Sequence, residues 1–174
     1  MAISLFHLTV PTYLQTLGAV SGFLDRGLSH FQENNVDPDE IVETRLFENM
    51  LPFKFQIWSV AHHSKGALDG LKAGVFGPPS PMGELNYAAL QKVIADTREG
   101  VQAITADQVK SLEGGDMAFE MGGRRIPFTA ENFILSFSLP NFHFHAATAY
   151  DILRTKGVPL GKRDYMGALR FKTG

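Results

Sequence analysis

The chain of 174 residues is long enough for a single domain, residues 1–174, with a full-sized hydrophobic core, and its 44% apolar and 20% charged residues are close to globular averages. Its 16 basic and 18 acidic residues leave a net charge of −2, so no strong field of one sign draws it to nucleic acid or to anionic lipid. The sequence has no cysteine, which excludes disulfides, thiolate metal ligands and cysteine nucleophiles.

The first predicted helix spans about residues 4–31. Its buried face should consist of the side chains that recur at steps of three and four, namely Val10, Leu14, Leu17, Ser21, Leu24, Leu28 and Phe31. Pro11 falls inside this pattern, so the first turns should be bent or begin later.

The N-terminal segment, residues 1–10, lacks the basic start and the continuous apolar stretch of a secretory signal peptide. No apolar run approaches the roughly 20 residues needed to span a bilayer. We therefore expect a cytoplasmic protein that has neither a membrane nor a nucleic acid as its partner.

A short helix is expected next, over about residues 37–44. Asp37 suits the N-cap, Pro38 the first helical position and Glu40 the reciprocal capping role.

The second long helix is predicted over residues 50–71, with Asn49 as a possible cap. Its core stripe should comprise Phe53, Ile57, Val60, Ala61, Ser64, Leu68 and Leu71. Residues 72–83 are rich in glycine and proline and are predicted to form a loop.

The third long helix is expected over residues 84–104, with a core stripe of Leu85, Ala89, Val93 and Val101. Thr105 and Gln108 then have the spacing of a capping box, which predicts a short helical turn.

Between residues 116 and 128 the apolar period changes from helical to alternating, with Gly122 and Gly123 in the middle. Two glycines between alternating runs predict a β-hairpin, because both central positions of the favoured turn need positive φ. The last long helix should run over residues 129–156, with a kink within a turn of Pro140, and residues 158–174 should form an extended tail.

These elements predict an all-α fold. We expect an up-and-down bundle of four long helices, with a small β-hairpin before the last helix.

The histidines are the main candidates for chemistry. On the last helix, Asn141 and His145 are one turn apart on the predicted inward face, whereas His143 points roughly opposite. We therefore expect His145 to be buried and His143 to be exposed. On the second helix, His63 is placed nearer the interior and His62 on the far side.

His63, Asn141 and His145 could thus converge between two helices, as metal ligands do in helical bundles. Imidazole suits zinc, nickel, copper and iron, and three protein ligands with one open position define a catalytic metal site. Asparagine is a poor ligand for such metals. The alternative is a metal-free polar pair in which Asn141 hydrogen-bonds to His145 across one helical turn.

The glycines at positions 66, 70 and 74 are spaced by four residues. This spacing is typical of close helix packing rather than of a phosphate-binding loop, and the sequence contains no nucleotide-binding motif.

The chain resembles an uncharacterised domain-of-unknown-function family within the DinB/YfiT-like superfamily of metal-dependent bundles. The similarity extends over nearly the whole chain, and its most specific part is 140–162. The stretches that carry it are 63–67, 140–145, 148–150, 152–154 and 157–162.

This resemblance implies a four-helix bundle of the superfamily's type, often a homodimer. Superfamily members that bind metal resemble thiol-dependent transferases or isomerases, and they use one histidine on the second helix and an HxxxH motif on the last. His63 matches the first of these ligands and His145 the second histidine of the motif. The first histidine of the motif is replaced by Asn141 in this chain.

Two hypotheses about function follow. In the first, the bundle binds a small-molecule ligand or a partner without a firmly bound metal, and His63, Asn141 and His145 form a polar network in the core. In the second, the same three residues hold a divalent metal such as zinc or nickel, in an enzyme of the thiol transferase/isomerase or hydrolase type. The replacement at Asn141 favours the first hypothesis, and the superfamily favours the second.

Overall fold

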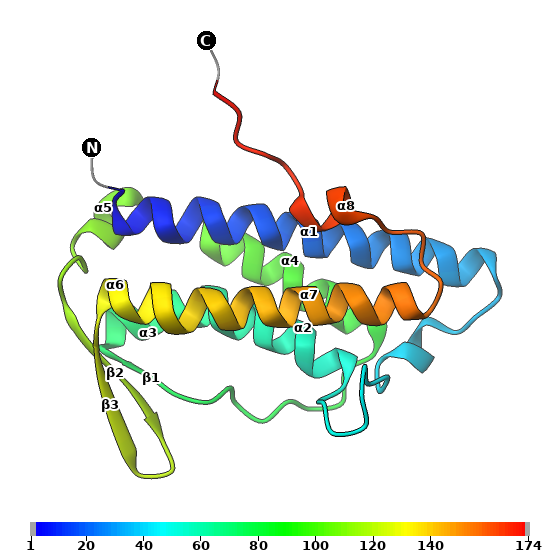
Figure 1. Ribbon diagram of the computed structural model, residues 1–174, viewed down its shortest axis with the longest axis horizontal. Coiled ribbons are helices and arrows are strands. Elements are labelled where there is room, and N and C mark those ends of the chain that lie inside the picture. The colour runs from blue at the N-terminus through cyan, green and yellow to red at the C-terminus, as the bar shows by residue number, and fades with distance from the viewer. Residues whose placement is uncertain (1–2, 173–174) are drawn as a thin grey trace.

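The computed structural model describes residues 3–172, and four long helical rods carry its fold (Figure 1). The rods are built, in chain order, from α1 (Leu5–Glu33), α2 (Phe53–Ala61) with η2 (His62–Gly66) and α3 (Ala67–Ala73), α4 (Tyr87–Gln102), and α6 (Ala130–Phe133) with η3 (Ile134–Ser138) and α7 (Leu139–Thr155). The elements η2 and η3 are π turns inside otherwise α-helical rods. α1 packs against α4 and α7, and α2 packs against the same two helices, so the core lies between the four rods.

The first rod confirms the predicted helix and accommodates its proline. The Ser4 hydroxyl caps the N-terminus by accepting from the backbone N–H of His7. Pro11 lies within the helix and has no N–H to donate to the carbonyl of His7. The Thr12 hydroxyl donates to that carbonyl instead, at 3.1 Å, so the proline leaves no unpaired acceptor there.

The short helix begins at the predicted cap, whereas the second rod begins later than predicted. Residues 37–44 contain a 3₁₀ helix, η1 (Pro38–Ile41), whose cap is the predicted Asp37. The second rod begins at Phe53 rather than at residue 50, and its N-cap is Pro52 rather than Asn49.

α4 is rotated relative to the predicted face. Asn86 caps it by accepting from Ala89 N–H, so the helix begins at Tyr87. Its buried residues are Tyr87, Leu90, Ile94, Thr97 and Val101. The predicted stripe through Leu85 was therefore wrong except for Val101. The capping box of Thr105 and Gln108 is confirmed at the start of α5 (Ala106–Lys110).

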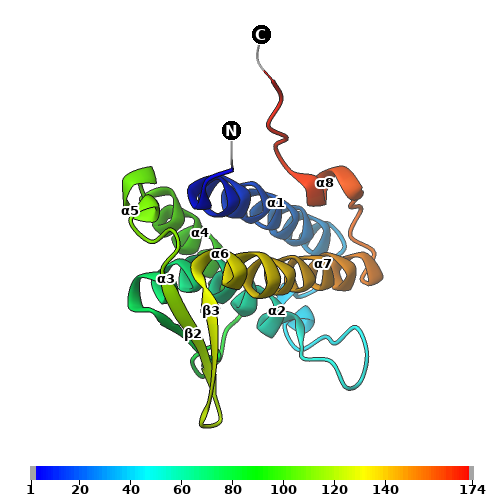
Figure 2. The same cartoon turned by 60° about the vertical axis from the view of Figure 1, so that its left-hand side comes forward.

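The structure also contains a small three-stranded sheet, so the label all-α was too simple. The predicted hairpin is confirmed as β2 (Asp116–Met121) and β3 (Arg124–Thr129), with both turn glycines at positive φ. A third strand, β1 (Val75–Phe76), lies in the segment that was predicted to be a loop, and it pairs parallel with β2. Figure 2 shows the hairpin projecting away from the helices.

The glycines of the second rod make room for this strand. A Cβ at position 70 would lie 2.9 Å from the Phe76 ring, and Gly74 ends α3 with φ of 70°. Close packing was predicted for these glycines, but the partner is strand β1 rather than a helix.

The last rod has a π turn before Pro140 in place of the predicted kink. η3 ends one residue before Leu139, and the ribbon continues along one axis through α7 (Figure 1). The rod ends as predicted, with Gly157 at φ of 86°.

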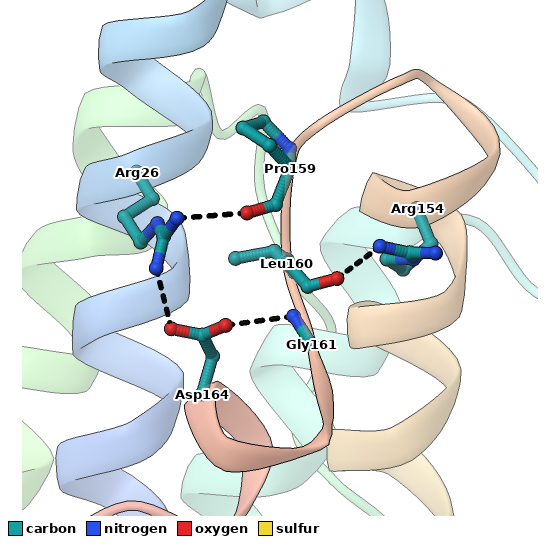
Figure 3. A network of polar contacts seen from close by, with 6 residues as sticks. All are labelled: Arg26, Arg154, Pro159, Leu160, Gly161 and Asp164. Carbon is teal, nitrogen blue, oxygen red and sulfur yellow. Dashed lines mark hydrogen bonds and ion pairs between the residues drawn. The ribbon is translucent and has the colours of Figure 1, made fainter.

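The C-terminal tail was predicted to be extended, but it contains a short helix, α8 (Lys162–Met166). Polar contacts hold this helix against α1 (Figure 3). The Arg26 guanidinium donates to Asp164 Oδ1 at 2.6 Å and to the carbonyl of Pro159 at 2.8 Å. The second oxygen of Asp164 accepts from Gly161 N–H at 2.7 Å. One carboxylate thus caps α8 and ties it to α1.

Two further contacts hold the same segment. Arg154 donates to the carbonyl of Leu160 (Figure 3), and Gln15 Nε2 donates to the carbonyl of Met166 at 2.9 Å. At Gly167 the chain comes so close to α1 that a Cβ would lie 2.9 Å from the carbonyl oxygen of Gln15.

None of the helices described between Ile3 and Lys172 has a stretch long and apolar enough to cross a bilayer.

Candidate functional site

The structure brings His63 and His145 together between the second and last rods. Their rings are nearly parallel, with centroids 5.7 Å apart and an interplanar angle of 16°. His63 is 8% exposed, so its predicted inward position is confirmed. His143 is exposed, as predicted, whereas His145 is only partly buried.

His62 belongs to the same cluster, contrary to the prediction that it lies on the far side. Its ring centroid is 5.2 Å from that of His63, and the ring stacks on Phe76 at 4.3 Å. The reason is strand β1, which was predicted to be a loop: its Phe76 and the carbonyl of the following Gly77 cover the side of the rod on which His62 lies. We call His62, His63 and His145 the histidine cluster.

The orientation of His145 is fixed by Gln56, which the sequence analysis did not single out as a site residue. His145 Nδ1 lies 2.8 Å from Gln56 Oε1. Gln56 Nε2 donates to the carbonyl of Leu51 at 2.7 Å, which turns the amide oxygen toward the histidine. His145 Nδ1 therefore carries the proton, and in the neutral ring Nε2 keeps its lone pair.

His62 is oriented in a similar way. Its Nε2 donates to the carbonyl of Gly77 at 2.8 Å, which leaves the lone pair on Nδ1. A Cβ at position 66 would lie 3.2 Å from this Nδ1, so a glycine one turn along the rod leaves space for the ring.

Asn141 does not join the two histidines through a hydrogen bond. Its amide Nδ2 donates to the carbonyl of Phe137, one turn back on its own rod, at 2.8 Å. The proposed bond between Asn141 and His145 was therefore wrong, because Gln56 is the partner of His145. Phe144, the residue before His145 on this rod, is 56% exposed.

His63 lies in the most apolar part of the cluster. Its ring is 5.6 Å from that of Phe76 and 5.8 Å from that of Phe137. Within the described part of the chain, His63 Nδ1 is buried and has no hydrogen-bond partner. A buried polar atom without a partner costs about 1–3 kcal/mol, so its presence calls for an explanation.

Burial keeps the whole cluster uncharged at neutral pH. It lowers the pKa of His63 to about 3, with smaller contributions from charge on His62 and His145. It lowers the pKa of His145 to about 4, with a contribution from His62, and it also lowers the pKa of His62. All three rings are therefore neutral imidazoles at pH 7.

The residues present do not fit the three-ligand metal site that the family resemblance implies. Of the predicted set, two are imidazoles, and the third is an amide whose Nδ2 is bound to a backbone carbonyl. Among residues 3–172, no three histidine, cysteine, aspartate or glutamate side chains are grouped so that they could hold a metal ion. A zinc-like site needs three or four such donors.

A separate surface cavity of about 600 Å³ lies at the N-terminal ends of α2 and α4. It is lined by Asp39, Val42, Glu43, Lys54, Glu84, Leu85, Asn86 and Ala89. None of the histidines is among these residues, so this cavity is distinct from the predicted site.

Comparisons with known proteins agree on the fold. The family model described as domain of unknown function (DUF1993) matches residues 5–166. The structure is similar to that of a DinB family member protein from Shewanella denitrificans, with a TM-score of 0.81 and 24% sequence identity, over 98% of this chain and 96% of that chain. Among the curated proteins, none matches this chain.

Proposed function

The chain belongs to the DUF1993 family and has a DinB-like fold, and from this premise we propose that it is a four-helix bundle that binds a small, uncharged ligand at the histidine cluster without a firmly bound metal. The observation that carries this proposal is the buried Nδ1 of His63, which has no hydrogen-bond partner among residues 3–172, beside two oriented imidazoles.

The surroundings select against a charged ligand. The cluster consists of neutral imidazoles, and phenyl rings from Phe76 and Phe137 surround His63. An ion bound here would lose its hydration without gaining an opposite charge. A flat, apolar molecule would keep favourable edge and face contacts with these rings.

The same arrangement favours a ligand that donates a hydrogen bond. In the neutral cluster, His145 Nε2 and His62 Nδ1 keep lone pairs, because their other nitrogens donate to carbonyl oxygens. A hydroxyl or N–H group on the ligand could donate to one of these nitrogens or to His63 Nδ1.

Thermal unfolding in the presence of phenol tests this function. Phenol combines a flat ring with one hydroxyl donor, and a ligand that binds only the folded state raises the Tm. We expect phenol to raise the Tm of the native protein and of His143→Phe, which changes the exposed histidine of the same rod. His63→Phe keeps a ring of similar size but has no nitrogen, and its Tm should not respond.

The alternative is a divalent-metal-dependent enzyme of the thiol transferase/isomerase or hydrolase type. One observation favours it: ligating histidines usually donate their second ring nitrogen to a carbonyl or carboxylate, as His145 does to Gln56. The variant Asn141→His restores the HxxxH motif and separates the two functions. We expect zinc or nickel to raise the Tm of this variant but not of the native chain. A rise in the native chain that His145→Phe abolishes would support the enzyme.

A further inference from the structure

The two π turns face each other across the core, and one serine joins them. Ser138, the last residue of η3, donates from its hydroxyl to the backbone carbonyl of His63 in η2, at 2.7 Å. The Tyr13 hydroxyl of α1 lies 2.7 Å from the same Ser138 oxygen. Since serine has only one hydroxyl proton, and it goes to His63, Tyr13 is the donor in the second bond.

These two hydrogen bonds, from Tyr13 to Ser138 and from Ser138 to His63, lie in the buried core. Tyr13 and Ser138 are both fully buried, and Phe142 packs edge-on against the tyrosine ring with centroids 5.0 Å apart. Burial raises the pKa of Tyr13 well above its ordinary value of 10, so the tyrosine remains a proton donor throughout the neutral range.

The backbone of a π turn explains why the link matters. Hydrogen bonds in such a turn run from residue i to i+5, so the carbonyls no longer have their ordinary α-helical partners. Serine hydroxyls accompany both turns. Ser64 donates to the carbonyl of Val60 at 2.7 Å, and Ser136 donates to that of Asn132. Ser138 differs from these two because it crosses from one rod to the other.

The bond from Ser138 is made to His63, the residue of the cluster whose ring is not held at Nδ1 by a hydrogen bond from residues 3–172. His145 is held through its ring by Gln56, and His62 through its ring by Gly77. His63 Nδ1 has no partner among the residues described, so the position of its ring depends on packing and on the backbone that Ser138 holds.

We infer that Tyr13 and Ser138 are positioning residues for His63: they fix the π turn η2 so that the ring of His63 is presented to the ligand. The inference rests on the proposed function, because it assigns a task to that same site. If Tyr13 and Ser138 only stabilised the fold, their replacement would lower the free energy of unfolding but would leave the position and tautomer of the His63 ring unchanged.

The test is a comparison of histidine side-chain NMR spectra, recorded at pH 7 with and without phenol. In Ser138→Ala, which loses both bonds, we expect the ring ¹⁵N resonances of His63 to move and phenol affinity to fall about tenfold, the change that corresponds to one hydrogen bond. In Tyr13→Phe, which keeps the bond from Ser138 to His63, both effects should have the same direction and be smaller.

The matched control is Tyr87→Phe. Tyr87 is also fully buried, and its hydroxyl donates to the carbonyl of Leu24 at 2.8 Å, but it lies between α1 and α4. This variant should lose stability as Tyr13→Phe does and leave the His63 resonances in place. Unchanged His63 resonances in folded Ser138→Ala and Tyr13→Phe would overturn the inference.

The resonance shift separates this inference from the proposed function. If phenol does not bind the native protein, the proposed function fails. The movement of the His63 resonances in the two variants still decides whether Tyr13 and Ser138 position the ring.

Discussion

The four helical rods fall into two pairs that differ in regularity. The pair of α1 and α4 is α-helical throughout its length, and its contact is made by closely fitted side chains such as Tyr87 against Gly27. The pair of the second and last rods contains both π turns and the histidine cluster. Regular packing stabilises a fold, whereas irregular backbone and buried polar groups cost stability and tend to occur at functional sites. We conclude that the packing of α1 and α4 provides stability, while the second and last rods form the site.

The largest expected effect is in the regular pair. Phe31→Ala removes a buried ring of α1 that packs edge-on against Tyr87 of α4, and it should lower the free energy of unfolding by about 3–5 kcal/mol. Urea denaturation measures this loss. The histidine resonances of the folded variant should remain unchanged, and a loss below about 1 kcal/mol would contradict the role assigned to this pair.

The closeness of this packing can be tested with two glycines of the same helix. A Cβ at position 27 would lie 2.5 Å from the Tyr87 hydroxyl, so Gly27→Ala should destabilise by about 1–3 kcal/mol. A Cβ at position 18 has no neighbour within 4 Å. Gly18→Ala should therefore stabilise, by up to about 1 kcal/mol, because alanine favours the helix. Equal effects of the two changes in urea denaturation would show that the fit at Gly27 is not close.

In the irregular pair, Gln56→Leu removes the acceptor of the His145 Nδ1 proton. A buried donor left without a partner costs about 1–3 kcal/mol, so we expect a loss in this range and a changed tautomer balance at His145. Chemical denaturation and the histidine ¹⁵N spectrum measure the two effects. A stable variant with an unchanged tautomer would mean that another group orients His145.

Acid should affect the second pair more than the first. The folded pKa values of His63 and His145, about 3 and about 4, lie below the unfolded value of 6.5. The unfolded chain therefore binds more protons between these values, and stability is fully present above about pH 6.5 and falls as the pH decreases toward 4. Within this window, we expect each ring to lower the free energy of unfolding by about 1 kcal/mol for each pH unit of decrease. His63→Phe should reduce the slope of unfolding free energy against pH, and an unchanged slope would contradict a neutral buried His63.

The smallest effect should lie outside both pairs, at the contact that fastens α8. The ion pair of Arg26 and Asp164 is partly exposed, and exposed pairs contribute about 0–1 kcal/mol. Arg26→Met should lower the Tm by at most a few degrees. A loss as large as that of Phe31→Ala would assign the tail a central part in the fold.

Much of the fold could be predicted because it depends on local signals. The apolar period gives the four rods, and the capping box of Thr105 and Gln108 and the glycine pair of the hairpin are both where they were predicted. The strand β1 could not be predicted, since two residues show no period and the strand forms only when β2 lies beside it. The π turns were also missed, because they too depend on packing. Signals of an irregular helix were nevertheless present: Pro140, and Ser64 and Ser136, whose hydroxyls donate to carbonyls one turn back.

The site could be predicted in part. Helical spacing placed His63 and His145 toward the interior, and their rings do meet at one interface. His62 was missed because strand β1, whose Phe76 covers its ring, was not predicted. Gln56 was not singled out, because an amide on the core face of a helix has no sequence pattern of its own. Tyr13 and Ser138 depend on contacts between rods that no single helix encodes.

The account is tested most directly by the long-range ¹H–¹⁵N spectrum of the histidine rings at pH 7, recorded while phenol is added. We predict three neutral rings in the cluster, with the proton on Nδ1 in His145 and on Nε2 in His62. Phenol should shift the resonances of His63 and His145 and leave those of the exposed His143 in place. A charged His145, or a spectrum in which phenol moves none of the cluster's resonances, would contradict a neutral ligand site at the two π turns.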